Sequence, residues 1–255
     1  MSDLQAIREK GVGILPHAIG DGPANMAIDE AMLEASARED RCYLRFYGWS
    51  EPTLSLGYFQ RMAEVDSDSR WRGRAIVRRP TGGGAIWHHH ELTYAMAAPS
   101  GQAHVRPNTS MYRAIHAAIA SVLAVQGIEA LRRGEPKAPA LGARPLLCFR
   151  GSDPEDLVWK GHKVVGSAQR RREGALLQHG SILLGQSPDV PELPGLRELS
   201  GLDRSPETWA EAIAPAIAEI LGLVPVPSDW PTGLRDRADQ LERSRYRDPA
   251  WTASR

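Results

Sequence analysis

Short apolar runs separated by turn-forming residues fill the middle of the chain, and this pattern restricts the fold more than any other feature of the sequence. Residues 85–99 alternate well enough for two strands joined by a polar turn near His89 and His90. A proline-containing turn lies between the runs 42–49 and 53–58, which predicts that they form a β-hairpin. The remaining runs with strand character cover residues 74–79, 146–149, 157–160, 162–168 and 175–184.

Helical periodicity is clearest in three segments beside these strands, and the polar tail from Pro231 to Arg255 is weakly helical. The first starts near Asn25, which we expect to cap it, and places Asp29 and Glu30 on its polar face. The other two, with their expected caps, are residues 108–126 with Asn108 or Ser110, and 207–221 with Ser205. Helices and strands do not alternate strictly, so the pattern favours an α+β fold over a doubly wound parallel sheet. We expect a mixed, largely antiparallel sheet with flanking helices.

Segments without a clear period separate these elements. We expect a lead-in at residues 1–24 and irregular, proline-rich loops at 132–145 and 186–206. A chain of 255 residues is long enough for one domain with a full hydrophobic core.

Charge and cysteine content narrow the class of protein. Lys+Arg and Asp+Glu are equal at 31 each, so no global field directs the chain to nucleic acid or to a membrane. The sequence contains no apolar run of about eighteen residues, as a transmembrane helix needs, and no apolar signal-peptide region near its start. Two cysteines do not make a disulfide scaffold, which favours a reducing, cytoplasmic setting.

Cys148 lies at the end of an apolar run, just before a polar Gly-Ser-Asp-Pro loop. A cysteine in an apolar run is commonly a small buried hydrophobe, whereas reactive groups are commonly displayed where a loop starts. A nucleophilic thiol needs a nearby cation, helix N-terminus or base to lower its pKa from about 8.5. The local sequence leaves both interpretations open.

Lys163 is the cation that could serve Cys148. It lies among glycines and valines in a strand-like run, where a buried ammonium requires a partner. On an edge strand it would lie in water instead. His179, on the next run, is either a base or a core histidine with satisfied hydrogen bonds, and the second is favoured. Most of the functional hypotheses depend on whether Cys148 and Lys163 face the same cleft.

Gly82, Gly83 and Gly84 follow a strand-like run that ends in Arg78 and Arg79. Three glycines let the backbone approach a ligand and direct its N–H groups at an acyl oxygen or a phosphate. They are equally typical of a flexible hairpin loop. Their spacing matches neither the P-loop nor the dinucleotide fingerprint, while the two arginines favour an anionic ligand.

The histidine triplet His88-His89-His90 does not predict a metal site. Adjacent residues of a strand point to opposite faces, so three in a row cannot converge on one ion. No acidic or cysteine partner lies at ligand spacing either.

Several ordered blocks resemble the signature blocks of the lipoate–protein ligase, octanoyltransferase and biotin–protein ligase superfamily. They are Asn25-Met-Ala-Ile-Asp-Glu-Ala, Arg45-Phe-Tyr-Gly-Trp-Ser, Arg79-Pro-Thr-Gly-Gly-Gly-Ala-Ile, Gly161-His-Lys-Val-Val-Gly-Ser-Ala-Gln-Arg and Leu177-Gln-His-Gly-Ser-Ile-Leu-Leu. The resemblance covers about residues 23–250. Within the superfamily, Cys148-Phe149 and Glu91-Leu-Thr-Tyr look most like the cysteine-dependent octanoyltransferases. The loop after Cys148 departs from the family in having no tyrosine.

This resemblance implies a fold of the biotin–protein ligase and lipoate–protein ligase catalytic domain, which is similar to that of class II aminoacyl-tRNA synthetases. It implies one domain over residues 1–255, with a core at about 23–225 and a tail, 226–255, packed on it. The ligases' accessory domain would be absent.

The resemblance also implies a mechanism. Cys148 would take an octanoyl group from acyl-carrier protein as a thioester, while Lys163 orients the carbonyl or stabilises negative charge. A lysine of a lipoyl domain, such as the glycine-cleavage H protein, would then take the group as an amide. Backbone N–H groups near Gly82–Gly84 and Gly166–Ala168 could form an oxyanion hole. The residues implied in substrate binding are Arg79, Thr81, Gly82, Gly83, Gly84, His88, Gly166, Ser167, Ala168, His179 and Gly180.

Three alternatives stay open under the resemblance. An ATP-dependent lipoate or octanoate ligase would use an acyl-adenylate and would need ATP and magnesium. A related enzyme would move the acyl group between two lipoyl domains, and a non-enzymatic acyl-binding module is the least favoured. The octanoyltransferase itself needs no cofactor, because thioester exchange is nearly isoenergetic. We expect a monomer without a nucleic-acid or membrane partner.

Overall fold

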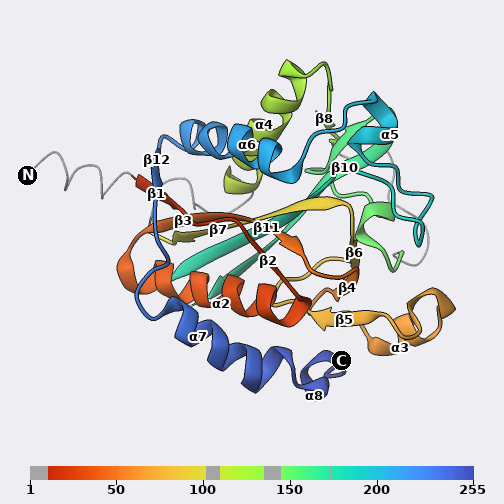
Figure 1. Cartoon of the computed structure of the whole chain (residues 1–255), viewed down its shortest axis with the longest axis horizontal. Coiled ribbons are helices and arrows are strands. Elements are labelled where there is room, and N and C mark those ends of the chain that lie inside the picture. The colour runs from red at the N-terminus through yellow and green to blue at the C-terminus, as the bar shows by residue number, and fades with distance from the viewer. Residues whose placement is uncertain (1–10, 102–109, 135–144, 173) are drawn as a thin grey trace, which may run out of the picture.

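The computed structural model describes residues 11–101, 110–134, 145–172 and 174–255, which form one large sheet, one small sheet and helices on both faces of the large sheet (Figure 1). The large sheet has the order β12-β1-β3-β7-β11-β10-β9-β8, with β2 paired to β3. Its strands are β1 (Gly11–Ile14), β2 (Ala18–Gly20), β3 (Cys42–Trp49), β7 (Glu91–Pro99), β8 (Leu131–Arg132), β9 (Leu157–Trp159), β10 (His162–Arg172), β11 (Ala175–Leu183) and β12 (Val224–Pro227).

Strand directions confirm the predicted α+β class with a mixed, largely antiparallel sheet. Pairing from β3 through β7, β11, β10 and β9 to β8 is antiparallel throughout. Only β1, β2 and β12 join at the other edge in parallel. Strands β1 and β2 lie in the segment predicted to be a lead-in, where the sequence analysis identified no strand. Neither strand exceeds four residues, which is too short for a clear period.

The small sheet corrects the predicted hairpin. Its central strand β4 (Thr53–Leu56) pairs in parallel with β5 (Ala75–Arg78) and antiparallel with β6 (Ile86–His88). Strand β3 pairs with β7 in the other sheet instead of with β4. All four residues of β4 are buried, and the strand pairs on both of its edges. The local sequence pattern does not show which strands those partners are. The two strands predicted within residues 85–99 are confirmed as β6 and β7, one in each sheet.

Helix α2 (Gly22–Glu39) covers one face of the large sheet, and the C-terminal helix α7 (Leu234–Leu241) packs on it (Figure 1). Asp21 caps α2, because its side chain accepts from the Ala24 N–H at 3.0 Å. The predicted cap, Asn25, instead donates to the carbonyls of Gly20 and Gly48 at 3.0 Å each, which fastens the helix to two strands.

Helices α4 (Ser110–Val125) and α6 (Pro206–Ile220) pack together on the opposite face of the large sheet (Figure 1). The predicted cap of α6 is confirmed, since Ser205 Oγ accepts from the Thr208 N–H at 3.2 Å. Asn108, a predicted cap of α4, lies outside the described residues. Each face carries its own apolar core: Ile115 and Ile213 belong to the one under α4 and α6, and Met32 to the one under α2.

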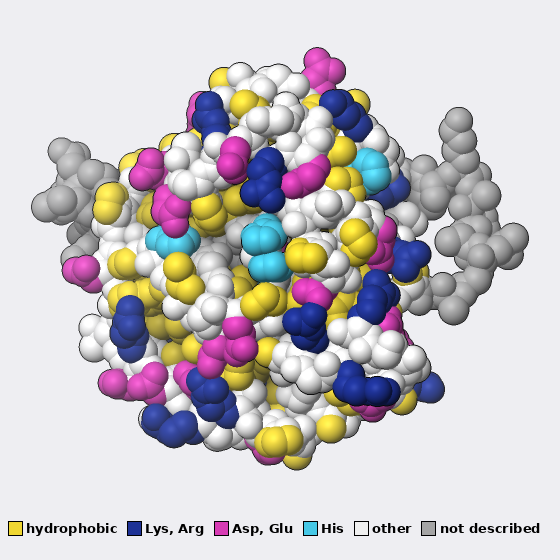
Figure 2. Space-filling model, turned by 45° about the vertical axis from the view of Figure 1, so that its right-hand side comes forward, with side chains coloured by type: hydrophobic (Ala, Val, Ile, Leu, Met, Phe, Trp, Pro, Cys, Tyr) yellow, Lys and Arg dark blue, Asp and Glu magenta, His cyan; other side chains and the backbone are white. Residues whose placement is uncertain are grey.

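The remaining short elements complete the outline. They are α3 (Met62–Asp66), a 3₁₀ turn (Ser69–Trp71), a second 3₁₀ turn (Cys148–Arg150), α5 (Leu196–Ser200), a π-helical turn (Glu242–Tyr246) and α8 (Pro249–Thr252). Helix α5 lies in a segment predicted to be a loop. No helix in the described ranges is both long and apolar enough to cross a membrane. Figure 2 shows acidic and basic side chains interspersed on the face drawn there.

Candidate active site

Cys148 is held against the end of the glycine run by two backbone hydrogen bonds. Its N–H donates to the Ala85 carbonyl at 2.7 Å, and the Ala85 N–H donates to the Leu146 carbonyl at 2.8 Å. A side chain at Gly84 would place its Cβ 3.0 Å from the Cys148 nitrogen, so glycine permits this approach. The predicted strand 146–149 is wrong: one bridge forms, between Ala85 and Leu147, and the chain then turns into the 3₁₀ turn. This turn leaves Cys148 half-buried instead of in the core.

Lys163 reaches Cys148 from β10. Its Nζ lies 3.2 Å from Cys148 Sγ and 3.3 Å from the Cys148 carbonyl oxygen. The alternative of an edge strand in water is wrong, because β10 lies between β9 and β11 and Lys163 is 5% exposed. A side chain at Gly166 would place its Cβ 2.4 Å from Lys163 Cε, so this glycine provides the space that the lysine occupies.

A second charge also contacts Lys163, and the sequence analysis did not identify it. Asp156 Oδ1 lies 2.8 Å from Lys163 Nζ. Desolvation is the largest single effect on the pKa of Lys163 and lowers it. The interactions with Cys148 and Asp156 together raise the pKa by more, so it lies above its ordinary value. The lysine therefore carries an ammonium between a sulfur and a carboxylate.

Cys148 opens onto a pocket that leaves about 380 Å³ unfilled, including its mouth. Many of the residues that the sequence analysis implied in substrate binding meet there. Those that line the pocket with Cys148 are Arg79, Gly83, His88, Ser167, Ala168, His179 and Gly180, while Met26, Tyr47, Ser55, Ile86, Thr93 and Ser181 line it without having been predicted. The other predicted residues do not line the pocket: Gly166 lies beside Lys163, and Thr81, Gly82 and Gly84 lie around Arg79.

Arg79 organises the glycine run. Its guanidinium is buried and donates to the carbonyls of Gly82 and Gly84, both at 2.7 Å. Because a trans peptide sets N–H opposite C=O, the Gly83 N–H then points away from the guanidinium. Three further hydrogen bonds go to the Ser55 carbonyl, Ser55 Oγ and Thr81 Oγ1. Desolvation lowers the pKa of Arg79 to about 10, with Cys148 opposing it, so the side chain remains a cation at neutral pH.

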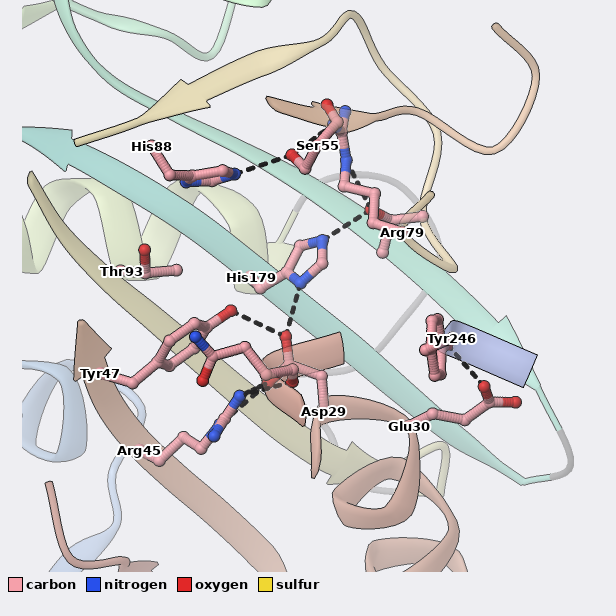
Figure 3. A network of polar contacts seen from close by, with 12 residues as sticks. Asp29, Glu30, Arg45, Tyr47, Ser55, Arg79, His88, Thr93, His179 and Tyr246 are labelled. Carbon is pink, nitrogen blue, oxygen red and sulfur yellow. Dashed lines mark hydrogen bonds and ion pairs between the residues drawn. The ribbon is translucent and has the colours of Figure 1, made fainter. Parts of the chain in front are cut away.

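Two hydroxyl–imidazole–carboxylate chains start at Arg79 and share one pattern. Figure 3 shows the contact of His179 with Asp29 in the first chain and that of His88 with Ser55 in the second. In the first, His179 Nε2 lies 2.6 Å from Thr81 Oγ1, and its Nδ1 lies 2.7 Å from Asp29 Oδ2. Asp29 also accepts from Arg45 and Tyr47, so its carboxylate is an acceptor here and the His179 Nδ1–H donates to it. His179 thus has both nitrogens engaged, which agrees with the favoured interpretation of a satisfied core histidine.

The second chain runs through His88. Its Nε2 lies 2.7 Å from Ser55 Oγ, and its Nδ1 lies 2.6 Å from Glu91 Oε1. Desolvation lowers the pKa of His88, with Glu91 opposing it, which favours a neutral ring at neutral pH. The His88 ring also stacks on Trp49 at 3.7 Å between centroids. The two chains fix both the tautomers of the histidines and the position of Arg79.

Asp29 and Glu30 are buried, which corrects their predicted place on a polar helix face. Asp29 Oδ1 accepts from Arg45 Nε at 2.9 Å, and Oδ2 from the Tyr47 hydroxyl at 3.0 Å (Figure 3). Burial raises the pKa of Asp29, but Arg45 and His179 lower it by more, and the net pKa lies below its ordinary value. The sequence analysis assigned both acids to solvent because their partners lie far along the chain: Asp29 contacts Arg45 and His179, and Glu30 contacts Arg172, Arg245 and Tyr246.

The other arginine of the predicted pair does not face the pocket. Arg78 donates to the carbonyls of Gly57, Gln60 and Thr252 at 2.7–3.0 Å, so it joins the C-terminal segment to the loop after β4. Its bonds to protein carbonyls give no support to the predicted anionic ligand at this position. Among the described residues, no group of three or more His, Cys, Asp or Glu side chains could hold a metal ion.

Comparison with known proteins places this geometry in a family. Residues 21–192 match the lipoyl protein ligase A/B catalytic domain family. The octanoyltransferase LipM of Kyrpidia tusciae is 36% identical over 260 residues, which cover 91% of this chain and 94% of the relative. That of Symbiobacterium thermophilum is 37% identical and covers 90% and 93% of the two chains.

Solved structures share the fold. A lipoate–protein ligase A bound with ATP has a TM-score of 0.77 at 24% identity, covering 96% of this chain and 98% of the other. A bi-partite lipoate protein ligase from Thermoplasma acidophilum has a TM-score of 0.75 at 21% identity, covering 96% of each chain. The family match spans more than half of this sequence, and the relatives align along nine-tenths of it. The chain therefore belongs to the lipoyl protein ligase A/B catalytic domain family.

Proposed function

We propose that this protein transfers an octanoyl group from acyl-carrier protein to a lysine of a lipoyl-domain protein through a thioester on Cys148. The reaction class follows from the relatives: they are octanoyltransferases that align along nine-tenths of the chain, so this chain is an acyltransferase of protein lipoylation. The thioester route rests on one observation, the 3.2 Å contact between Cys148 Sγ and Lys163 Nζ at the pocket wall.

In the first half of the reaction, the Cys148 thiolate attacks the carbonyl carbon of the carrier's thioester. The new C–S bond to Cys148 forms as the bond to the carrier's sulfur breaks, and the leaving thiolate takes the proton of the Lys163 ammonium. Thioester is exchanged for thioester, so the step requires no ATP. Storing the acyl group on Cys148 lets the donor carrier leave before the acceptor binds.

In the second half, the neutral amine of the acceptor lysine attacks the Cys148 thioester. An amide bond forms, the Cys148 thiolate leaves, and the proton released by the attacking nitrogen returns to Lys163. The enzyme is thereby restored to its starting charge state. Because an amide is more stable than a thioester, this step drives the transfer forward.

The glycine run is the better source of an oxyanion hole. The Gly83 N–H points away from Arg79, and Gly83 lines the pocket beside Cys148. By contrast, the Ser167 N–H already donates to the Tyr112 hydroxyl at 3.0 Å. We assign the remaining pocket wall, including His88, Ala168, His179 and Gly180, to binding of the acyl group.

Intact-mass spectrometry after incubation with octanoyl-acyl-carrier protein, without ATP, tests the proposal. The wild-type protein should gain one octanoyl group, and Cys148→Ala should gain none while its unfolding transition stays in place. Cys42→Ala is the matched control, because Cys42 is 1% exposed in the core and should not affect the adduct. Transfer that persists in Cys148→Ala refutes the thioester route.

The same assay separates the alternatives. Transfer of free octanoate or lipoate only in the presence of ATP would identify an acyl-adenylate ligase. Octanoylated H protein, supplied as the sole donor, would reveal transfer between lipoyl domains. Activity with octanoyl-acyl-carrier protein as the sole donor supports the reaction proposed here.

A further inference from the structure

Asp156 lies in the loop between the Cys148–Arg150 turn and β9, and its carboxylate is buried. Its side chain is 1% exposed, and its Oδ2 accepts from the Asp153 backbone N–H at 2.9 Å. Its own carbonyl accepts from the Arg133 N–H at 2.8 Å, which fixes the loop from the other side. A carboxylate in such a place requires a counter-charge. Within the described ranges, Lys163 is the cation at ion-pair distance.

The contact between Asp156 and Lys163 is chiefly Coulombic. Asp156 Oδ1 lies 2.8 Å from Nζ, and the attraction between the two charges affects the pKa of each group more than hydrogen bonding does. Lys163 also donates to Cys148, whose Sγ and carbonyl oxygen are 3.2 and 3.3 Å away. The ammonium is held between carboxylate and sulfur without being turned away from the sulfur.

The two neighbours of Lys163 differ in one respect. The sulfur of Cys148 cannot carry a charge once it is acylated, because a thioester is neutral. Asp156 is not acylated: burial raises the pKa of its carboxyl, and the charge of Lys163 opposes this rise. In the acyl-enzyme Asp156 is then the group that holds Lys163 in place and keeps the amine basic enough to recover a proton.

We propose that Asp156 is a positioning residue, which holds Lys163 against the Cys148 sulfur in the free enzyme and in the acyl-enzyme. The part that concerns the acyl-enzyme rests on the proposed function. The part that concerns the free enzyme rests on geometry alone. Cys148, Lys163 and Asp156 thus act as a sulfur–ammonium–carboxylate triad, and the loop that departs from the family supplies its third member.

Alkylation of Cys148 by iodoacetamide at pH 7, followed by intact mass, tests the free enzyme without any acyl donor. Asp156→Asn keeps the shape and removes the charge, and we expect the rate to fall about 10- to 100-fold, because Lys163 is no longer held. Asp156→Glu should recover part of the rate. Asp153→Asn is the control, because it removes an exposed acid from the same loop. Asp153 contacts Asp156 through its backbone N–H and carbonyl, and its side chain accepts from the Glu155 N–H. Asp153→Asn can keep all three contacts, since an asparagine side-chain oxygen also accepts. It should alkylate like the wild type.

A double variant keeps the test decisive if Asp156→Asn folds poorly. Lys163→Met removes the group through which Asp156 is proposed to act, and Asp156→Asn with Lys163→Met leaves no unpaired charge. If Asp156 acts through Lys163, the double variant alkylates at the rate of Lys163→Met alone. The proposal is overturned if Asp156→Asn slows alkylation of the Lys163→Met protein by as much as it slows that of the wild type. It is also overturned if Asp156→Asn alone alkylates at the wild-type rate.

Octanoyl transfer supplies the readout for the acyl-enzyme. Asp156→Asn should lower kcat with KM changed less than about twofold, since Asp156 is buried and does not line the pocket. If the wild type forms no acyl adduct, the proposed function fails, whereas the alkylation result still decides the role of Asp156. An equal loss of kcat in Asp156→Asn, Asp156→Glu and Asp153→Asn would show a structural role instead.

Discussion

Gly166→Ala should show whether the position of Lys163 controls the reaction. The new Cβ would lie 2.4 Å from Lys163 Cε and 2.7 Å from Nζ, and an ordinary contact begins at 3.4 Å. The end of the lysine must therefore move by about 1 Å. It is the flexible end of a side chain, so it moves in preference to the backbone. The 3.2 Å contact with Cys148 Sγ is then lost.

A displacement of about 1 Å in a reacting group lowers the rate by about 10²-fold. This corresponds to about 2.7 kcal/mol of activation free energy. The backbone at Gly166 should not oppose the change, because this residue does not have a positive φ. Any loss of stability should therefore come from displacement of Lys163 in its buried ion pair with Asp156. The kcat for octanoyl transfer and urea unfolding measure the two effects.

Gly48→Ala is the matched control for this prediction. It adds the same methyl group to a strand glycine, and its Cβ would meet Ile19 at an ordinary 3.4 Å. We expect it to keep wild-type activity. If Gly166→Ala transfers octanoyl groups within about threefold of the wild-type rate, then the position of Lys163 does not control the reaction, and the mechanism argued from the Sγ–Nζ contact is refuted.

Two further predictions concern buried titratable groups behind the pocket. Asp29→Asn should lower the free energy of unfolding by about 3–5 kcal/mol at pH 7, because it leaves Arg45 buried without its carboxylate. The pKa of Asp29 is lowered in the folded state, so its contribution to stability is complete above about pH 3.9 and is lost as the pH falls further. Urea unfolding should therefore show a smaller difference between the wild type and Asp29→Asn at pH 3 than at pH 7. An equal difference at the two pH values contradicts this. Desolvation lowers the pKa of His116 to about 4, so the wild type should lose up to about 3 kcal/mol from this group as the pH falls from about 6.5 to 4. His116→Gln should flatten this part of the stability profile, and parallel profiles would refute the assignment.

Periodicity and turn residues predicted the class of fold and most central strands, because both are local properties of the chain. They did not predict which strands pair. The runs that became β3 and β4 look like a hairpin, yet β3 pairs with β7 and β4 with β5 and β6. Buried strands carry apolar residues on both faces, so their sequences do not distinguish one partner from another. The short strands β1, β2 and β12 lack a period and were missed.

The candidate site shows the same division. Cys148 and Lys163 were identified from their neighbours along the chain and from the resemblance to a family. Asp29 was not: its spacing on α2 is typical of a solvent-facing acid, and Arg45 and His179, which neutralise and bind it, come from β3 and β11.

The sequence by itself determined the residue types of the site: a cysteine at a loop, a lysine among glycines, and a glycine run after two arginines. Tertiary structure decided the charges and distances between them. It placed Asp156 at Lys163, joined Arg79 to two histidine–carboxylate chains, and left Arg78 to hold the C-terminal segment. The physical reason is that a charge can be buried only where a partner meets it, and such partners come from segments far apart in the chain.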